Sequence, residues 1–250
     1  MHPGHGQACH SESGAWTEAR ERYAAACRLR ERASAGRPMR LLDVGTGLGL
    51  NLAAAHEALD GTGAALEVVT LESDPSVIES CLELGPGSAS AAPWARATRE
   101  LLSLALARPD QPIHHERGEL TLVLGNARER IGDLPEARPF DAVFLDPFSP
   151  QVDSELWQHD FLAAIAARMA PDAILSTYTT SLRVRVGLAA AGLNLAAGPR
   201  VGAKAGGTLA SHAEIGPPLD SRTVRRVRKR VRALTEPTEQ QAEEAASPRS

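Results

Sequence analysis

The sequence predicts an α/β fold with a mostly parallel sheet, helices on both faces and a terminal antiparallel hairpin. Along residues 39–190, short apolar runs that end in glycine or an acidic residue alternate with stretches of helical periodicity. This alternation is typical of parallel strands joined by crossover helices. The apolar runs 193–197 and 207–212 have no helical stretch between them, and they predict the hairpin.

The composition fits one domain with extensions at both ends. The chain has 250 residues, of which 43% are hydrophobic, and no apolar run approaches the length of a membrane span. We expect an N-terminal strap and helix in residues 1–38 and the main domain in residues 39–216, with an insertion at about 84–112. Residues 217–250 are expected to form a basic amphipathic helix and a disordered tail.

The N-terminal sequence lacks a basic stretch followed by an apolar one, and three cysteines are too few for a disulfide framework. Both observations favour a cytoplasmic protein, and no membrane partner is expected. No metal site is predicted, because the N-terminal set of possible ligands matches no zinc-binding spacing. That set is His2, His5, Cys9 and His10.

The net charge of −4 conceals an uneven distribution. Residues 1–220 hold 19 Lys and Arg against 27 Asp and Glu, whereas residues 221–250 hold 8 against 4. A polyanionic partner must therefore be bound by local basic patches or by the C-terminal segment. In that segment an apolar stripe runs among arginines, which predicts the amphipathic helix. The stripe consists of Val224, Val227, Val231 and Leu234.

A glycine-rich turn follows the first predicted strand. Glycine lets a backbone adopt conformations closed to other residues, and lets a ligand lie against bare peptide at the first turn of a helix. A dinucleotide-binding loop would have its third glycine at position 50, where this chain has leucine. The spacing therefore resembles the loop of S-adenosylmethionine methyltransferases more than a nicotinamide site. A turn without a ligand is the alternative. The three glycines are Gly45, Gly47 and Gly49.

Acidic and amide side chains follow the next two predicted strands. The strand at 66–71 ends in Glu72, which is placed to accept both ribose hydroxyls of a nucleoside lying over the glycine turn. A solvated carboxylate at the strand end is the alternative. The strand at 119–124 precedes Asn126, whose side-chain oxygen can accept a hydrogen bond from an adenine amino group. An ordinary turn residue is equally compatible with this position.

The fourth predicted strand, at 140–145, ends in Asp146-Pro-Phe-Ser-Pro150. An acid and an aromatic ring at this edge of the sheet suit a nucleophile that is planar or bears an amine. Asp146 can orient or deprotonate the amine, and Phe148 can stack on a base. A strand-to-helix turn capped by Asp146 is the alternative. A helix at 155–169 and a strand at 172–178 are expected to follow, and a further helix is expected at 17–32.

The order of these motifs resembles that of the MnmC-like methyltransferases, the methyltransferase half of a bifunctional enzyme that modifies the tRNA wobble uridine. The resemblance covers about residues 41–211. The matching stretches are Asp43-Val-Gly-Thr-Gly-Leu-Gly-Leu-Asn51, Leu71-Glu72, Leu120-Thr-Leu-Val-Leu-Gly125, Phe144-Leu-Asp-Pro-Phe-Ser-Pro150, Glu155-Leu-Trp157, Ser176-Thr-Tyr-Thr179, Val184-Arg-Val-Gly-Leu188 and Gly202-Ala-Lys-Ala-Gly-Gly207.

The resemblance implies a Rossmann-like class I methyltransferase fold. It also implies methyl transfer from S-adenosylmethionine to the amine of 5-aminomethyl-(2-thio)uridine in tRNA, with Asp146 as the catalytic residue. Separate enzymes would supply the aminomethyl uridine, because no second nucleotide-binding loop for an FAD-dependent oxidoreductase half is visible. Pro147 stands where the family usually has glycine. The cofactor would contact Gly45, Gly47, Gly49, Asn51, Glu72, Asn126 and Asp146, and the tRNA would contact Phe148, Arg183, Arg200 and Lys204.

Two other functions remain open from the sequence. Asp-Pro-Phe also resembles the motif of methyltransferases that act on the exocyclic amine of adenine or on glutamine side chains. The other hypothesis is a non-catalytic module of the same fold that binds RNA or a nucleoside.

Overall fold

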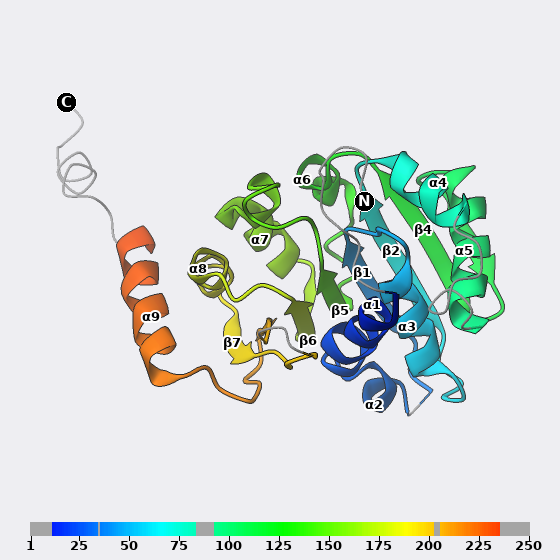
Figure 1. The fold of residues 1–250 in the computed structure, drawn as a ribbon. Helices are drawn as coiled ribbons and strands as arrows, with labels where there is room; N and C mark the ends of the chain where they lie inside the picture. The colour runs from blue at the N-terminus through cyan, green and yellow to red at the C-terminus, as the bar shows by residue number, and fades with distance from the viewer. Residues whose placement is uncertain (1–11, 35, 84–92, 203–205, 236–250) are drawn as a thin grey trace.

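The predicted α/β architecture is confirmed. The computed structural model describes residues 12–34, 36–83, 93–202 and 206–235. An eight-stranded sheet runs in the order β3-β4-β2-β1-β5-β6-β8-β7, and helices cover both of its faces (Figure 1). Several expectations concern residues outside the described ranges. These are the histidines and cysteine of residues 1–11, the loop at 84–92, Lys204, and the tail from Glu236.

The middle of the sheet is parallel. β1 pairs with β2 and β5, β2 also pairs with β4, and β5 pairs with β6. All six residues of β5 are buried, as expected for a strand covered on both faces. The five strands are β1 (Met39–Val44), β2 (Leu66–Glu72), β4 (Gly118–Leu124), β5 (Phe140–Leu145) and β6 (Met169–Thr177).

Two apolar layers enclose the sheet. One contains buried residues of α3, α5 and the N-terminal helices, and the other contains buried residues of α6, α7 and α8. The helices therefore bury their apolar faces on opposite sides of the strands, which gives three layers. The helices that follow the parallel strands are α3 (Leu50–Leu59), α4 (Pro75–Glu83), α5 (Pro93–Leu106), α6 (Ala127–Arg130), η2 (Ile131–Asp133), η3 (Glu155–Trp157), α7 (His159–Ala166) and α8 (Leu182–Ala190).

Antiparallel strands complete both edges of the sheet. The predicted hairpin is present as β7 (Asn194–Ala197) and β8 (Thr208–Ser211). At the other edge, β3 (Pro112–His115) pairs antiparallel with β4, although the sequence indicated only a chain break at 109–112. This strand is four residues long and only Ile113 is buried, so its sequence carries no alternation that would reveal it.

The two longest predicted helices are interrupted. The helix expected at 155–169 is divided into η3 and α7, because Gln158 has an extended backbone with ψ of 153°. Met169 belongs to β6, where it pairs with Phe140. The helix expected at 17–32 consists of α1 (Glu12–Glu18), the π-helix η1 (Ala19–Ala25) and α2 (Leu29–Ala33). Arg28, whose φ is +56°, separates η1 from α2.

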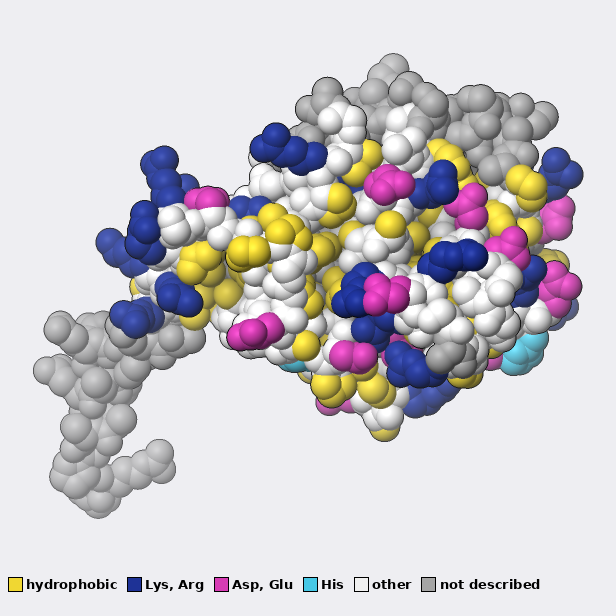
Figure 2. All heavy atoms as spheres, turned by 90° about the horizontal axis from the view of Figure 1, so that it is seen from below, with side chains coloured by type: hydrophobic (Ala, Val, Ile, Leu, Met, Phe, Trp, Pro, Cys, Tyr) yellow, Lys and Arg dark blue, Asp and Glu magenta, His cyan; other side chains and the backbone are white. Residues whose placement is uncertain are grey.

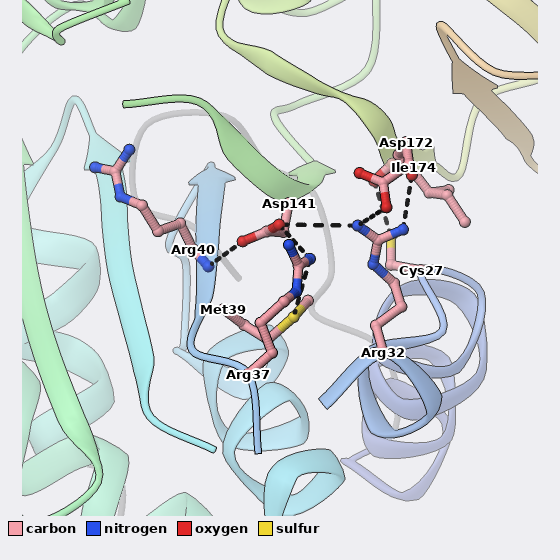
Figure 3. Close-up of polar contacts among 8 residues, drawn as sticks. All are labelled: Cys27, Arg32, Arg37, Met39, Arg40, Asp141, Asp172 and Ile174. Carbon is pink, nitrogen blue, oxygen red and sulfur yellow. Dashed lines mark hydrogen bonds and ion pairs between the residues drawn. The ribbon is translucent and has the colours of Figure 1, made fainter. Parts of the chain in front are cut away.

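The N-terminal helices are attached to the sheet by polar contacts around Asp141 of β5 (Figure 3). The Asp141 carboxylate accepts hydrogen bonds from the Arg37 side chain at 2.6 Å and from the Arg40 backbone N–H at 2.8 Å. Arg32 of α2 lies 3.8 Å from the same carboxylate and donates to the carbonyl oxygen of Asp172 at 2.7 Å. These contacts connect α2 with β1, β5 and β6 at the end of the sheet where the parallel strands begin.

We predict that Asp141→Asn lowers the free energy of unfolding by about 1–3 kcal/mol, because the buried Arg40 N–H and Arg37 lose a charged acceptor. Urea titration measures this loss. Asp172→Asn is the matched control, because the Asp172 side chain is 64% exposed, and surface pairs contribute at most about 1 kcal/mol. Equal losses for the two variants would show that Asp141 has no special part in attaching the N-terminal helices.

The C-terminal helix α9 (Ser221–Thr235) begins after Asp220, which caps it by accepting a hydrogen bond from the Thr223 backbone N–H at 2.9 Å. It packs on α8, at the end of the sheet that carries β7 (Figure 1). Val227 is buried in this contact. Among the described residues, no helix is both long enough and apolar enough to cross a membrane.

Candidate functional site

The site lies at the carboxyl end of β1, where the order of the strands along the sheet reverses. β1 is flanked by β2 on one side and by β5 on the other, and ligands of open α/β sheets bind at such a switch point. Val44 pairs with Leu145, and the Asp146 backbone N–H donates to the Val44 carbonyl oxygen at 2.9 Å. The glycine turn after β1 and the acidic turn after β5 therefore lie side by side. A cavity of about 870 Å³ opens between them.

The three glycines of the turn have different surroundings. Gly45 has a φ of +91°, and a Cβ atom there would lie 2.7 Å from the Asp146 carbonyl oxygen, so only glycine fits. Gly47 lines the cavity, and its Cβ position has no protein atom closer than 3.9 Å, which leaves room for a ligand against the backbone. Gly49 does not line the cavity. Its Cβ position is 2.6 Å from Leu102 of α5, so Gly49 serves helix packing.

A buried polar chain supports the glycine turn from beneath. The Thr70 hydroxyl donates to the Asp43 carboxyl at 2.7 Å and contacts the Thr46 hydroxyl at 2.5 Å. Burial raises the pKa of Asp43 well above its usual range, and the Thr70 hydrogen bond acts in the opposite direction. These hydrogen bonds link β1 and β2, near their carboxyl ends, to the turn.

Glu72 lies at the carboxyl end of β2 and lines the cavity. One carboxylate oxygen accepts from the Gly47 backbone N–H at 3.1 Å, and the other accepts from the backbone N–H groups of Ser73 and Asp74 at 2.8 and 3.1 Å. Glu72 therefore fixes the glycine turn. Each carboxylate oxygen has two acceptor sites, so the oxygen that binds the Gly47 N–H keeps one site, which can accept a ribose hydroxyl.

Asn126 caps a helix and lines the cavity. Its side-chain oxygen accepts from the Arg128 backbone N–H at 3.0 Å, which caps α6. The residue also lines the cavity. An amide oxygen has a second lone pair, so the helix cap leaves it able to accept from an adenine amino group.

Both carboxylate oxygens of Asp146 have a donor. The Tyr23 hydroxyl donates to one at 2.5 Å, and the Asn51 side-chain amide donates to the other at 2.8 Å. Tyr23 lies in the π-helix η1 and is 1% exposed, with its ring 5.4 Å from that of Phe144. No sequence pattern indicates this role of Tyr23, because its partner is 123 positions away.

The surroundings of Asp146 set its protonation state. Burial raises the pKa of Asp146 to about 6, whereas the hydrogen bonds from Tyr23 and Asn51 lower it. A carboxylate with this pKa is mostly ionised at neutral pH and is a better proton acceptor than an ordinary aspartate. It fits the requirements of a general base at the floor of the cavity.

Aromatic residues from two other elements hold the turn after β5. The Trp157 indole N–H donates to the Phe148 carbonyl oxygen at 2.9 Å, and the Tyr178 hydroxyl donates to the Pro147 carbonyl oxygen at 3.1 Å. The two rings meet edge to face with centroids 5.9 Å apart. Phe148 lines the cavity beside Asp146. The hydrogen bonds use carbonyl groups, so Pro147, which lacks an N–H, is accommodated.

The N-terminal helices form one wall of the cavity. Arg22 is 1% exposed, its guanidinium donates to Glu18 at 2.9 Å, and its carbonyl oxygen accepts from the Ser176 hydroxyl at 2.5 Å. Carboxylates outnumber cations along the cavity, since Arg22 is the one Lys or Arg among the described lining residues. The cavity therefore favours a cationic ligand. The lining carboxylates belong to Glu18, Glu72, Asp146, Asp153 and Glu155.

Of the residues predicted to contact tRNA, Phe148 lines this cavity, whereas Arg183 and Arg200 do not. Arg183 is exposed on α8, and Arg200 is exposed in the connection after β7. Arg185, two positions after Arg183, is instead a structural residue, because it donates to the Thr208 hydroxyl at 2.9 Å. The structure thus gathers the predicted cofactor residues, apart from Gly49, and leaves Arg183 and Arg200 outside the cavity.

Comparisons with known proteins agree with this geometry. A family described as S-adenosyl-L-methionine-dependent methyltransferase matches residues 92–213. The tRNA 5-methylaminomethyl-2-thiouridine biosynthesis bifunctional protein MnmC of Pseudomonas aeruginosa (strain UCBPP-PA14) is 36% identical over 200 residues. The alignment covers 75% of this chain and 29% of that protein. MnmC of Aromatoleum aromaticum is 31% identical, with 84% of this chain and 33% of that protein covered.

A solved structure extends the comparison. The crystal structure of MnmC2 from Aquifex aeolicus has a TM-score of 0.70 and 31% identity, covering 84% of this chain and 65% of that one. The chain belongs to the MnmC-like S-adenosylmethionine-dependent methyltransferases. Its cofactor is S-adenosylmethionine. The residues fit that group, since the open backbone at Gly47, the carboxylate of Glu72 and an acidic cavity suit a cationic nucleoside.

We predict that Glu72→Gln weakens S-adenosylmethionine binding by about tenfold or more, because the single oxygen of an amide cannot accept from the Gly47 N–H, from the two N–H groups after β2 and from a ribose hydroxyl. Isothermal titration calorimetry measures the affinity. Glu67→Gln is the matched control on the same strand, since Glu67 pairs with Arg40 and Arg138 and does not line the cavity. Equal affinities for the two variants would remove Glu72 from the cofactor site.

We predict that Tyr23→Phe shifts the acid limb of the kcat/KM profile upward by about one pH unit, because the hydroxyl no longer stabilises the Asp146 carboxylate. Activity that requires ionised Asp146 falls as pH drops through its pKa, so loss of the donor moves this fall to higher pH. Tyr178→Phe is the control, because Tyr178 donates to Pro147 rather than to Asp146. If the acid limb of the kcat/KM profile of Tyr23→Phe stays at the wild-type pH, Tyr23 has no part in the ionisation that governs activity.

Proposed function

We propose that this chain methylates the amine of 5-aminomethyl-(2-thio)uridine at the wobble position of tRNA. The observation that carries the proposal is the Asp146 carboxylate, held by Tyr23 and Asn51 at the floor of an acidic cavity beside Phe148. The similarity to MnmC supports the choice of substrate. Because the chain spans only 29% of the length of that relative, the substrate is part of the proposal.

The chemistry requires a neutral amine in line with an activated methyl group. S-adenosylmethionine supplies this methyl on a sulfonium. As the new N–C bond forms and the S–C bond breaks, the amine nitrogen becomes positively charged and must lose a proton. Asp146, with a pKa of about 6, holds the amine and accepts or relays this proton. Alignment of the two reactants supplies much of the acceleration, without a covalent enzyme intermediate.

The negative charge of the cavity wall favours an amine as the methyl acceptor. Five carboxylates line the cavity and Arg22 is hydrogen-bonded to Glu18, so an approaching ammonium group is attracted and an anionic acceptor is repelled. Phe148 offers a face on which the uracil ring can stack. Arg183 and Arg200, which lie outside the cavity, are proposed tRNA contacts, and Lys204, which is outside the described residues, is a further proposed contact.

The three parts of the chain have different proposed roles. In this proposal residues 39–216 carry the methyltransferase site, the described helices within residues 1–38 supply one of its walls, and helix α9 within residues 217–250 is a basic appendage. Methylation alone is assigned to this chain, and separate enzymes would supply the aminomethyl uridine. A methyltransferase that acts on adenine or on glutamine side chains is the competing function, because the Asp-Pro-Phe turn would serve an exocyclic amine or amide equally well.

We predict that Asp146→Asn lowers the methylation rate by about a hundredfold or more, the scale for loss of a general base, while cofactor affinity stays within a few-fold. The substrate is tRNA from a strain that accumulates the aminomethyl uridine, and nucleoside mass spectrometry identifies the product. Wild-type protein with no wobble product, but with methylated adenine or glutamine, would overturn the proposed function. Wild-type turnover by Asp146→Asn would show that Asp146 has a structural role only.

A further inference from the structure

Helix α9 presents an unusually basic surface. Its fifteen residues, Ser221–Thr235, include six arginines and one lysine but no acidic residue. Figure 2 shows Lys and Arg side chains gathered over this helix, whereas basic and acidic side chains are interspersed over the rest of that face. All seven cations are exposed. They are Arg222, Arg225, Arg226, Arg228, Lys229, Arg230 and Arg232.

The apolar stripe of α9 is largely covered by the protein. The helix packs on α8. Val227 is 6% exposed, Val224 and Val231 are half-buried, and of the four stripe residues only Leu234 is exposed, at 62%. A helix that binds a membrane surface must place its apolar face in the lipid. The protein itself covers this apolar face, so a partner would contact the exposed cations rather than the apolar stripe.

The rest of the chain has the opposite charge. The whole chain carries −4, and α9 carries +7, so the other residues together carry −11. A polyanion is repelled by such a body and attracted to the one helix, within a screening length of about 10 Å at 0.1 M salt. The cations from Arg222 to Arg232 extend over about 15 Å at the rise of an α-helix, which is long enough to contact more than one phosphate.

We propose that α9 is a docking surface for the phosphate backbone of RNA, which holds the substrate on a protein whose catalytic cavity is acidic. The inference rests on the proposed function for the identity of the RNA. The recognition itself is by charge and carries no sequence information. The helix is a permanent part of the fold, because Asp220 caps it and Val227 anchors it to α8.

The test is a charge-only variant with Arg225, Arg226, Lys229 and Arg230 replaced by Gln, which keeps the apolar stripe and a comparable helix propensity. Binding of an unmodified tRNA transcript is followed by fluorescence anisotropy over a salt series. We expect at least about tenfold weaker binding near 0.1 M salt, and a salt slope reduced by about one for each side chain that contacts a phosphate. Affinity for S-adenosylmethionine should stay unchanged.

The matched control removes the same number of positive charges at the opposite side of the fold. It replaces four exposed arginines with Gln, and it should bind tRNA nearly as tightly as the unaltered protein. Those arginines are Arg28, Arg30, Arg96 and Arg108.

Two outcomes would overturn the proposal. One is equal tRNA binding by the α9 variant and the control across the salt series. The other is loss of binding to phosphatidylglycerol vesicles in the α9 variant with tRNA binding retained, which would make α9 a membrane surface. Because binding is measured without turnover, the absence of a methylated wobble product would refute the proposed function and leave this inference standing.

Discussion

The site depends on the need of the half-buried Asp146 carboxylate for hydrogen-bond donors. A charged group taken out of water costs several kcal/mol unless it is paired or hydrogen-bonded. Tyr23 from the N-terminal π-helix and Asn51 from α3 meet this need, each at one carboxylate oxygen. The catalytic group, the cofactor helix and the N-terminal wall are therefore held in one arrangement, and none of the three can move without breaking a hydrogen bond to Asp146.

The N-terminal helices are consequently part of the site. They are anchored at the opposite end of the strands by Arg32 and Arg37, which contact Asp141 of β5. Since Asp141 and Asp146 lie on the same chain segment, β5 and the turn after it, one strand holds the wall at both ends. The π-helix η1 places Arg22 and Tyr23 consecutively at buried positions, and such irregular helical turns are frequent at functional sites.

The sequence predicts those parts of the site that follow from local pattern. Parallel strands bring their carboxyl ends to one edge, so the glycine turn, Glu72, Asn126 and Asp146 could be placed together from strand order alone. Tyr23 could not, because a hydrogen bond across 123 positions leaves no local trace. Gly49 shares the spacing of its neighbours, yet it meets Leu102 of α5, and only tertiary packing distinguishes it from Gly47. The break at Gln158, which divides the predicted helix, and the edge strand β3 were also not predicted, because they too depend on tertiary packing.

The cavity is acidic and helix α9 is basic. The proposed RNA substrate must contact both of them. A cavity lined by five carboxylates suits a sulfonium and an amine, but the same field would repel the phosphates of the proposed RNA substrate. Cations placed inside the cavity would weaken its hold on both ligands and raise the energy of a positively charged nitrogen during transfer. Positive charge for the RNA is therefore best placed outside the cavity, where salt screens it from Asp146 within about 10 Å. Helix α9, which contributes no residue to the cavity lining, meets that requirement.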